Sequence, residues 1–286
     1  MKGLDRHRKE VDRIDDQILA LLTKRAKVVQ AIGRLKKTRQ AGLHSPAREL
    51  EIYERLTTQN TGPLPNEAVR AVFREIISAS LSLEGPLKVA YLGPKATFTH
   101  MACLQQFGDS ATYIPVDSIG EVFSEVERGR AEYGVVPIEN STEGIVSHTL
   151  DVFVDSPLKI TGEVLQEVSH HLMSKSGRIE DNIHNFTRFL VVSRTSPERT
   201  GRDKTSVMFS VKDRTGALYD LLRPFAMRGI NLTKIESRPS RRKAWEYLFF
   251  VDVEGHVADE RVKQTLEEVK RQCLFLKILG SYPSGT

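Results

Sequence analysis

The N-terminal segment contains a helical pattern that is too long for a small domain to bury alone. Residues 5–39 contain no proline and one glycine, Gly33. Apolar side chains recur there at steps of three and four residues and form a heptad-like seam, made up of Val11, Ile14, Ile18, Leu21, Val28, Ile32 and Leu35. A helix of about 35 residues spans roughly 50 Å. We therefore expect it to require a partner, and the same helix of a second chain would supply one.

Arg25 stands where this seam calls for an apolar side chain. A permanently charged guanidinium needs a counter-anion there, because burying an unpaired charge costs several kcal/mol. From the residues alone, a salt bridge to an Asp or Glu of a neighbouring helix is the simpler explanation. A bound carboxylate ligand is the alternative.

Two shorter helices are predicted after the long one. Ser45-Pro46 is typical of an N-cap followed by a first helical position, and it predicts a helix through Arg55. A third helix is expected from about residue 66 to 83. Gly85-Pro86 then ends the pattern, so residues 1–85 are predicted to form an all-α domain.

The periodicity changes after Lys88, where short β-rich runs alternate with helical stretches. Strands are expected at 88–92, 111–116, 133–138, 160–165, 168–174 and 186–193, with helices at 98–107, 118–128 and 144–154. This alternation is typical of an α/β domain with a mostly parallel sheet, which we place at residues 86–195.

The polar segment 195–203 contains Pro197 and Gly201 and is predicted to be a linker. Residues 203–286 follow as a C-terminal domain. Its expected elements are a strand (204–211), a helix (215–228), two strands (231–237 and 245–253), a helix (258–272) and a strand (274–281). This βαββαβ order is that of the ferredoxin-like arrangement.

Charge and cysteine content exclude several classes of protein. The 42 Lys and Arg residues are interspersed with 37 Asp and Glu residues, which argues against a nucleic-acid-binding face but is compatible with small anionic substrates. Cys103 and Cys273 have no spacing typical of a disulfide framework or a metal site. The charged N-terminus and the short apolar runs predict neither a signal peptide nor a membrane span. We expect a cytoplasmic protein.

Five short segments carry polar residues at the ends of predicted elements. Each taken singly is typical of an ordinary turn, cap or strand end. Gly93-Pro94 precedes a helix, so the amides of residues 95–99 could bind an anion. The others are Pro137-Ile138-Glu139-Asn140-Ser141, Asn185-Phe186-Thr187-Arg188-Phe189, Gly216-Ala217-Leu218-Tyr219 and Glu236-Ser237-Arg238-Pro239.

In this order the five segments together resemble prephenate dehydratase with its phenylalanine-sensing ACT domain. The first 85 residues resemble the helical chorismate mutase that is fused to it in bifunctional P-proteins. The resemblance implies a periplasmic-binding-like fold for the middle domain. It also implies phenylalanine biosynthesis without a metal or cofactor, in a homodimer or higher homo-oligomer.

For the mutase, the resemblance implies a site that clamps the two carboxylates of chorismate and stabilises the ether oxygen as its bond breaks. Lys36 and Glu84 would flank that oxygen, with Glu84 acting only when protonated. Ser45 would face the substrate hydroxyl, and Arg8 would reach the site of the partner chain. Taken singly, Arg8, Lys36 and Arg48 are equally well explained as solvated surface. The implied catalytic set is Arg8, Arg25, Lys36, Arg48, Glu49, Ser80 and Glu84.

For the dehydratase, the resemblance assigns Thr187 as the group that protonates the leaving hydroxyl of prephenate. The implied substrate-binding residues are Thr97, Glu139, Asn140, Ser141, Arg188 and Phe189. In the C-terminal domain, phenylalanine would bind between two copies, held by the segments Gly216, Ala217, Leu218, Tyr219 and Glu236, Ser237, Arg238, Pro239.

One part of the family pattern is missing from this sequence. The family has a second lobe that forms the other wall of the dehydratase site, whereas only Ser176–Asn185 lies here. A segment of that size predicts a loop. The leading hypothesis is a bifunctional enzyme whose dehydratase activity is doubtful. The alternatives are a phenylalanine-regulated chorismate mutase with an inactive dehydratase remnant and a non-catalytic amino-acid-binding regulatory protein.

Overall fold

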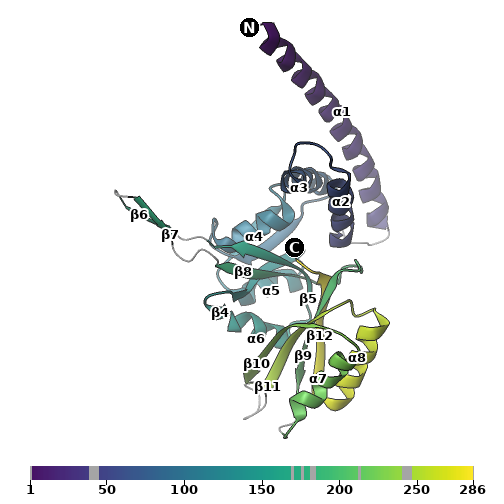
Figure 1. The fold of residues 1–286 in the computed structure, drawn as a ribbon, viewed down its shortest axis with the longest axis vertical. Coiled ribbons are helices and arrows are strands. Elements are labelled where there is room, and N and C mark those ends of the chain that lie inside the picture. The colour runs from purple at the N-terminus through teal and green to yellow at the C-terminus, as the bar shows by residue number, and fades with distance from the viewer. Residues whose placement is uncertain are drawn as a thin grey trace. The chain divides into compact units, whose positions relative to one another are not determined.

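A computed structural model describes residues 2–38, 45–168, 171–174, 177–180, 185–211, 214–239 and 247–285 (Figure 1). At residues 2, 36–38, 171–174 and 177–180 it describes the backbone only. The chain divides into two compact units. The first consists of residues 1–45, 51–87 and 107–112, and the second of residues 46–50, 88–106 and 113–286.

The first unit is helical, as predicted. Its elements are α1 (Lys2–Thr38), most of α2 (Pro46–Gln59) and α3 (Asn66–Ser82), and α1 packs against α3. The apolar seam of α1 is exposed in the single chain. Its first residue, Val11, is 55% exposed, and its last, Leu35, is 63% exposed. Near the end of α1, Gly33 lies so close to Glu84, which follows α3, that an added Cβ would be 2.8 Å from Cγ of Glu84. A larger residue there would have to displace the Glu84 side chain.

The second unit begins with a six-stranded sheet in the order β2-β1-β3-β8-β5, with β4 paired to β3. The helices α5 and α6 pack on β3. The bounds are β1 (Lys88–Leu92), α4 (Phe98–Phe107), β2 (Thr112–Val116), α5 (Ile119–Glu127), β3 (Tyr133–Asn140), β4 (Gly144–Ile145), α6 (Ser147–Asp155), β5 (Lys159–Glu167) and β8 (Phe186–Ser193).

The sheet is mixed, so the expectation of a mostly parallel sheet is met only in part. β1 and β3 are parallel, but β8 runs antiparallel to both β3 and β5, and β4 runs antiparallel to β3. A parallel pair would need a long crossover between the strands, whereas antiparallel neighbours need only a short connection. The described residues between β5 and β8 contain no such crossover.

The segment between β5 and β8 also differs from the prediction. The expected strand 168–174 is shorter and lies outside the main sheet, as β6 (His171–Ser174). It pairs with β7 (Gly177–Glu180), which forms where a loop was expected. Local alternation does not reveal which strand is a partner, so the sequence indicated one strand of this hairpin and missed the other.

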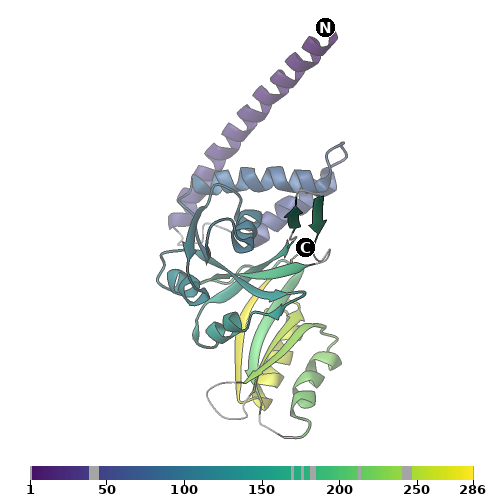
Figure 2. The same cartoon turned by 90° about the vertical axis from the view of Figure 1, so that its left-hand side faces the viewer.

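The C-terminal part of the second unit is a four-stranded antiparallel sheet in the order β10-β11-β9-β12. Two helices cover one face of it, as Figure 2 shows. Its elements are β9 (Asp203–Ser210), α7 (Ala217–Met227), β10 (Leu232–Pro239), β11 (Tyr247–Glu254), α8 (Glu260–Gln272) and β12 (Phe275–Pro283).

Alternation along these strands divides the apolar side chains between two cores. Val207 and Phe209 of β9 pack with α7 and α8. Met208, between them, packs with Phe153 and Leu190 of the six-stranded sheet and its helices. The second of these two cores, which contains Met208, therefore lies between the two sheets of the second unit and is shared by them.

β5 and β12 approach each other closely where the two sheets meet. A Cβ built at Gly280 would lie 2.1 Å from the carbonyl oxygen of Ile160, so only glycine fits. The Nζ of Lys277 donates to the carbonyl oxygens of Phe153 and Ser156 at the end of α6, at 2.9 and 2.6 Å. A cation at a helix C-terminus satisfies carbonyls that have no partner within the helix.

No helix within the described ranges is both long and apolar enough to cross a bilayer.

Candidate functional sites

In the first unit, Arg25 extends from α1 to α3. Its guanidinium donates to the hydroxyl of Ser80 and, at 3.4 Å, to the carbonyl oxygen of Ile76. Partial burial lowers the pKa of Arg25. No Asp or Glu within the described parts of the chain forms an ion pair with it. The salt bridge that was the simpler explanation is therefore not formed among these residues, and a carboxylate ligand stays as the predicted counter-anion.

Glu84 lies close to the same helix pair and is buried. It lines an open cavity of about 290 Å³ together with Gln30, Gly33, Arg34 and Leu83. Ser80 is one helical turn before Glu84 and is also buried. The structure thus brings three of the predicted mutase residues, Arg25, Ser80 and Glu84, to the α1–α3 contact.

The other predicted mutase residues are placed differently. Arg8 is exposed and pairs with Asp5 at 3.9 Å. It lies 17 residues before Arg25, or about 25 Å along the helix, too far to reach the same site within one chain. Arg48 and Glu49 lie in the first turn of α2, within the part that belongs to the second unit, and Ser45 precedes that turn. Lys36 lies on α1, but its side chain is outside the described residues.

In the second unit, Thr187 of β8 lies directly opposite Asn140 of β3. The Nδ2 of Asn140 donates to the Thr187 hydroxyl at 2.8 Å and to Oδ1 of Asn185 at 2.6 Å. Ser141 accepts from the backbone of Phe186 at 2.9 Å. The sequence analysis did not include Asn185 in the site, although its place at the head of the β8 segment was a usable signal.

Thr97 lies just before α4, where its side chain stabilises a local turn. Its hydroxyl donates to the carbonyl oxygen of Pro94 at 3.0 Å. Near it, Nδ1 of the buried His100 accepts from the amide of Ala96 at 3.4 Å, and the ring stacks on Tyr91. No role was predicted for His100, since a single histidine on a helix carries no pattern of its own.

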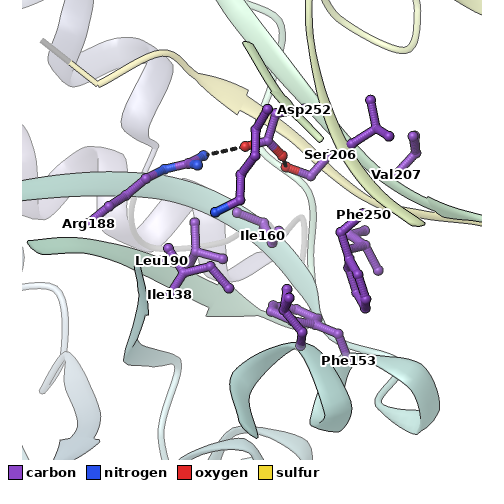
Figure 3. Close-up of a pocket in the computed structure, with 13 residues that line it drawn as sticks. Ile138, Phe153, Ile160, Arg188, Leu190, Ser206, Val207, Phe250 and Asp252 are labelled. Carbon is purple, nitrogen blue, oxygen red and sulfur yellow. Dashed lines mark hydrogen bonds and ion pairs between the residues drawn. The ribbon is translucent and has the colours of Figure 1, made fainter. Parts of the chain in front are cut away.

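The placement of Arg188 does not favour its predicted role as a substrate ligand. Successive residues of a strand face opposite sides of a sheet, so Arg188 is turned away from Thr187. It is buried, and its three nitrogens donate to Glu163 (2.7 Å), Glu139 (3.0 Å) and the hydroxyl of Tyr282 (3.1 Å). A further carboxylate, Asp252, lies 2.8 Å away (Figure 3). Glu139 is likewise held by protein cations, and Phe189 is part of the core.

These contacts shift the pKa of each group in the direction that favours its charged form. Burial on its own would raise the pKa of the Glu163 carboxyl, but Arg188 and Lys204 outweigh it and the pKa falls below its usual value. The pKa of Glu139 is lowered in the same way by Lys234 and Arg188, against burial. Burial would lower the pKa of Arg188, but Tyr282, Asp252 and Glu163 raise it. All these groups stay charged at neutral pH.

The predicted regulatory segments lie on α7 and β10. Gly216 caps α7 with φ of 77°, a conformation that favours glycine, Ala217 is buried, and Tyr219 is 68% exposed. Arg238 donates to the carbonyl oxygen of Ser147 and pairs with Asp151 of α6 at 3.3 Å. Within the described residues of one chain, the segments 216–219 and 236–239 form no hydrogen bond with each other.

Among the described residues, no group of three or more His, Cys, Asp or Glu side chains is placed to hold a metal ion.

A helical domain with an arginine at a helix contact, an α/β domain and an antiparallel α+β domain define a multidomain protein. Family models match the same three regions: chorismate mutase type II over residues 7–85, prephenate dehydratase over 89–179 and the ACT domain over 205–271.

The chain is 44% identical to the bifunctional chorismate mutase/prephenate dehydratase of Aquifex aeolicus, covering 100% of this chain and 99% of that protein. The chain belongs to this family. The alignment is 358 positions long against 286 residues here, so at least 72 of its positions fall opposite gaps in this chain.

Two solved structures resemble about two thirds of the chain. The prephenate dehydratase of Arthrobacter aurescens in complex with L-Phe has a TM-score of 0.60 and is 30% identical, covering 68% of this chain and 89% of that one. The prephenate dehydratase of Streptococcus mutans has a TM-score of 0.57 and is 35% identical, covering 70% and 100%.

Proposed function

We propose that this protein is an enzyme of phenylalanine biosynthesis that rearranges chorismate to prephenate in its helical domain. The observation that carries this proposal is Arg25, a half-buried cation held only by a hydroxyl and a carbonyl oxygen among the described groups. A carboxylate of the substrate would complete its coordination. The reaction is an internal rearrangement, so the protein has to fix the reactive conformer and stabilise developing charge, without a nucleophile, metal or cofactor.

The mutase site is proposed to be completed by a second copy of the chain. The exposed seam of α1 offers an apolar face for that copy. The distance along α1 between Arg8 and Arg25 supports a role for Arg8 in the site of the partner. Lys36, Arg48, Glu49 and Ser45 are proposed to join Arg25, Ser80 and Glu84 there.

The finer architecture is also a proposal. We assign residues 1–85 to the mutase, 86–195 to the dehydratase and 203–286 to the regulatory domain. The strand order β10-β11-β9-β12 with two helices on one face supports a ferredoxin-like fold for the last of these. The middle domain is proposed to be one lobe of a periplasmic-binding-like fold.

The dehydratase site is proposed to use Thr187 as the acid, positioned by Asn140 at 2.8 Å. Thr97 and Ser141 are proposed to border the substrate. Because the facing wall would have to come from a lobe that this sequence lacks, we expect dehydratase activity to be severely impaired. A site without that wall neither excludes water nor orients its donors. The alternative function is therefore a phenylalanine-regulated chorismate mutase with a dehydratase remnant.

Phenylalanine is proposed to bind the C-terminal domain at the segments 216–219 and 236–239. The left-handed Gly216 and the exposed Tyr219 leave the first segment open to a second copy of the domain. Substrates and effector are then all small molecules, with no nucleic acid or membrane involved.

The test is an assay of the purified chain with chorismate, following chorismate consumption and phenylpyruvate formation separately, with and without phenylalanine. We expect chorismate to be consumed without added metal and phenylpyruvate to stay at the uncatalysed level. Phenylpyruvate formation that Thr187→Ala abolishes would contradict the impaired dehydratase. Unchanged chorismate would contradict the mutase, and a non-catalytic amino-acid-binding protein would then be the better description if phenylalanine still binds.

A further inference from the structure

The buried charges around Arg188 form a balanced cluster that joins the two sheets of the second unit. Its carboxylates are Glu139, Glu163 and Asp252, and its cations are Arg188, Lys204 and Lys234. Arg188, Glu163 and Asp252 are buried, and Glu139, Lys204 and Lys234 are half-buried. Three charges of each sign pair within the cluster, which offsets the cost of burying them.

The C-terminal sheet contributes to this cluster from every one of its strands. Lys204 lies on β9, Lys234 on β10, Asp252 on β11 and Tyr282 on β12. The hydroxyl of Ser206 joins the last two, at 2.5 Å from Asp252 and 2.7 Å from Tyr282. A cavity of about 20 Å³ beside Arg188, Asp252 and Lys234 has room for about one water molecule (Figure 3).

On the six-stranded sheet, this cluster lies directly behind the predicted acid. Glu139 pairs with Arg188 across β3 and β8, and the next residues along the same two strands, Asn140 and Thr187, also pair. The ion pair is on one side of the sheet, and the hydrogen bond between Asn140 and Thr187 is on the other. A shift of either strand therefore moves both pairs together.

Lys234 connects this arrangement to the strand that carries the predicted regulatory segment. Its Nζ binds Glu139, and it lies two residues before Glu236 on β10. Four residues further along, Arg238 binds α6. β10 is thus attached to the six-stranded sheet and its helix at two points on one face.

We propose that Lys234 and Arg188 are positioning residues, which hold Asn140 and Thr187 in register and couple a ligand on β10 to them. The catalytic meaning of this coupling rests on the proposed function. Arg188 acts on the back of the sheet through Glu139 and does not bind substrate. A movement of β10 displaces Glu139, because Lys234 of β10 binds it. The neighbouring Asn140 then loses its alignment with the Thr187 hydroxyl.

The test uses the full chain and measures hydrogen–deuterium exchange at the ends of β3 and β8, which needs no dehydratase activity. Lys234→Gln removes the charge with little change in length, and Lys234→Arg restores it. Lys263→Gln on the exposed side of α8 is the matched control. Arg188 is not substituted, because its loss would leave three buried carboxylates without their shared cation.

Without ligand, we expect Lys234→Gln to speed exchange of residues 138–141 and 186–189 by about tenfold or more, the scale of a local opening. We expect Lys234→Arg to restore the parent rates and the control to match them. Unchanged rates at these residues, or equal acceleration throughout the second unit, would overturn the positioning role.

With phenylalanine, we expect the parent to change exchange at the same residues. Lys234→Gln should bind phenylalanine within about threefold of the parent affinity, a loss of under about 1 kcal/mol, yet show no such change. Binding that alters both proteins equally, or neither, would overturn the coupling. Failure of the parent to bind phenylalanine would instead refute the proposed regulatory function, and the ligand-free comparison would still decide the positioning role.

Discussion

Arg25 is half-buried and Arg188 is buried, and the groups around each guanidinium distinguish the roles of the two residues. Arg188 is enclosed by three protein carboxylates, so its charge is used within the fold. Arg25 has a hydroxyl and a carbonyl oxygen as its described partners. Since a half-buried cation is stabilised by an anion, Arg25 is suited to an anionic ligand. The family resemblance implied the same ligand-binding role for both arginines.

Replacement of Arg25 tests this distinction. We expect Arg25→Ala to lower kcat/KM for chorismate by at least about a hundredfold, the scale of losing a charge-assisted contact in the transition state. Arg13→Ala is the control, because Arg13 lies on the same helix and its only described pairing is the exposed one with Glu10. Turnover of Arg25→Ala near that of the control would refute a role in catalysis.

At the scale of elements, the strands are placed by their partners more than by their own sequences. The predicted bounds of β1 and α4 agree with the structure, since each has a strong local pattern. The antiparallel direction of β8 was not predicted, because direction depends on the connection between strands. The same reversal leaves Thr187 beside Asn140 and Arg188 beside Glu139.

The close approach of β5 and β12 gives a prediction about stability. We expect Gly280→Ala to destabilise the second unit by about 1–3 kcal/mol, because the new methyl group would meet the carbonyl oxygen of Ile160. Gly120→Ala on α5 is the control, since nothing lies within 4 Å of its added Cβ. Urea unfolding of both variants measures the difference. Equal stability of the two would mean that the strands separate at little cost.

At the scale of the whole second unit, the shared core and the charge cluster join its two sheets. Met208, Phe250 and Tyr282 of the C-terminal sheet pack with Phe153 and Leu190 of the other part. We infer that the two parts unfold together. The C-terminal domain then packs directly on the domain that carries Thr187. A movement of one domain would therefore displace the other.

The lowered pKa values of Glu139 and Glu163 predict a loss of stability in acid. A carboxyl whose pKa is lower in the folded state binds fewer protons there than when unfolded. Its contribution is complete above the unfolded pKa of about 4.3 and disappears as pH falls through the folded value. We expect the urea midpoint of the second unit to fall steadily below about pH 5.

Glu163→Gln identifies the group responsible for this acid dependence. At pH 7 the variant should be less stable by about 3–5 kcal/mol, because Arg188 and Lys204 lose a buried partner. That difference should shrink as pH falls below about 4.3, because the unfolded parent then binds a proton at Glu163 more readily than the folded parent does. A difference that stays constant between pH 7 and pH 3 would show that Glu163 does not titrate as proposed.

The sequence by itself indicated a three-part organisation and most element bounds. These follow from periodicity and from capping and turn residues, which are local along the chain, whereas the candidate site residues came from the resemblance to a family. The break in the seam at Arg25 is local in the same sense, because one residue departs from its neighbours.

Tertiary structure alone decided which side of the sheet each site residue occupies and what it binds there. The cluster of Arg188, Glu163, Lys234 and Asp252 joins residues from four strands that are far apart in the chain. No local pattern records such a meeting, because ion pairs form between side chains that chain reversal and strand pairing bring together. For the same reason Arg188, adjacent to Thr187 in sequence, serves the opposite face of the sheet.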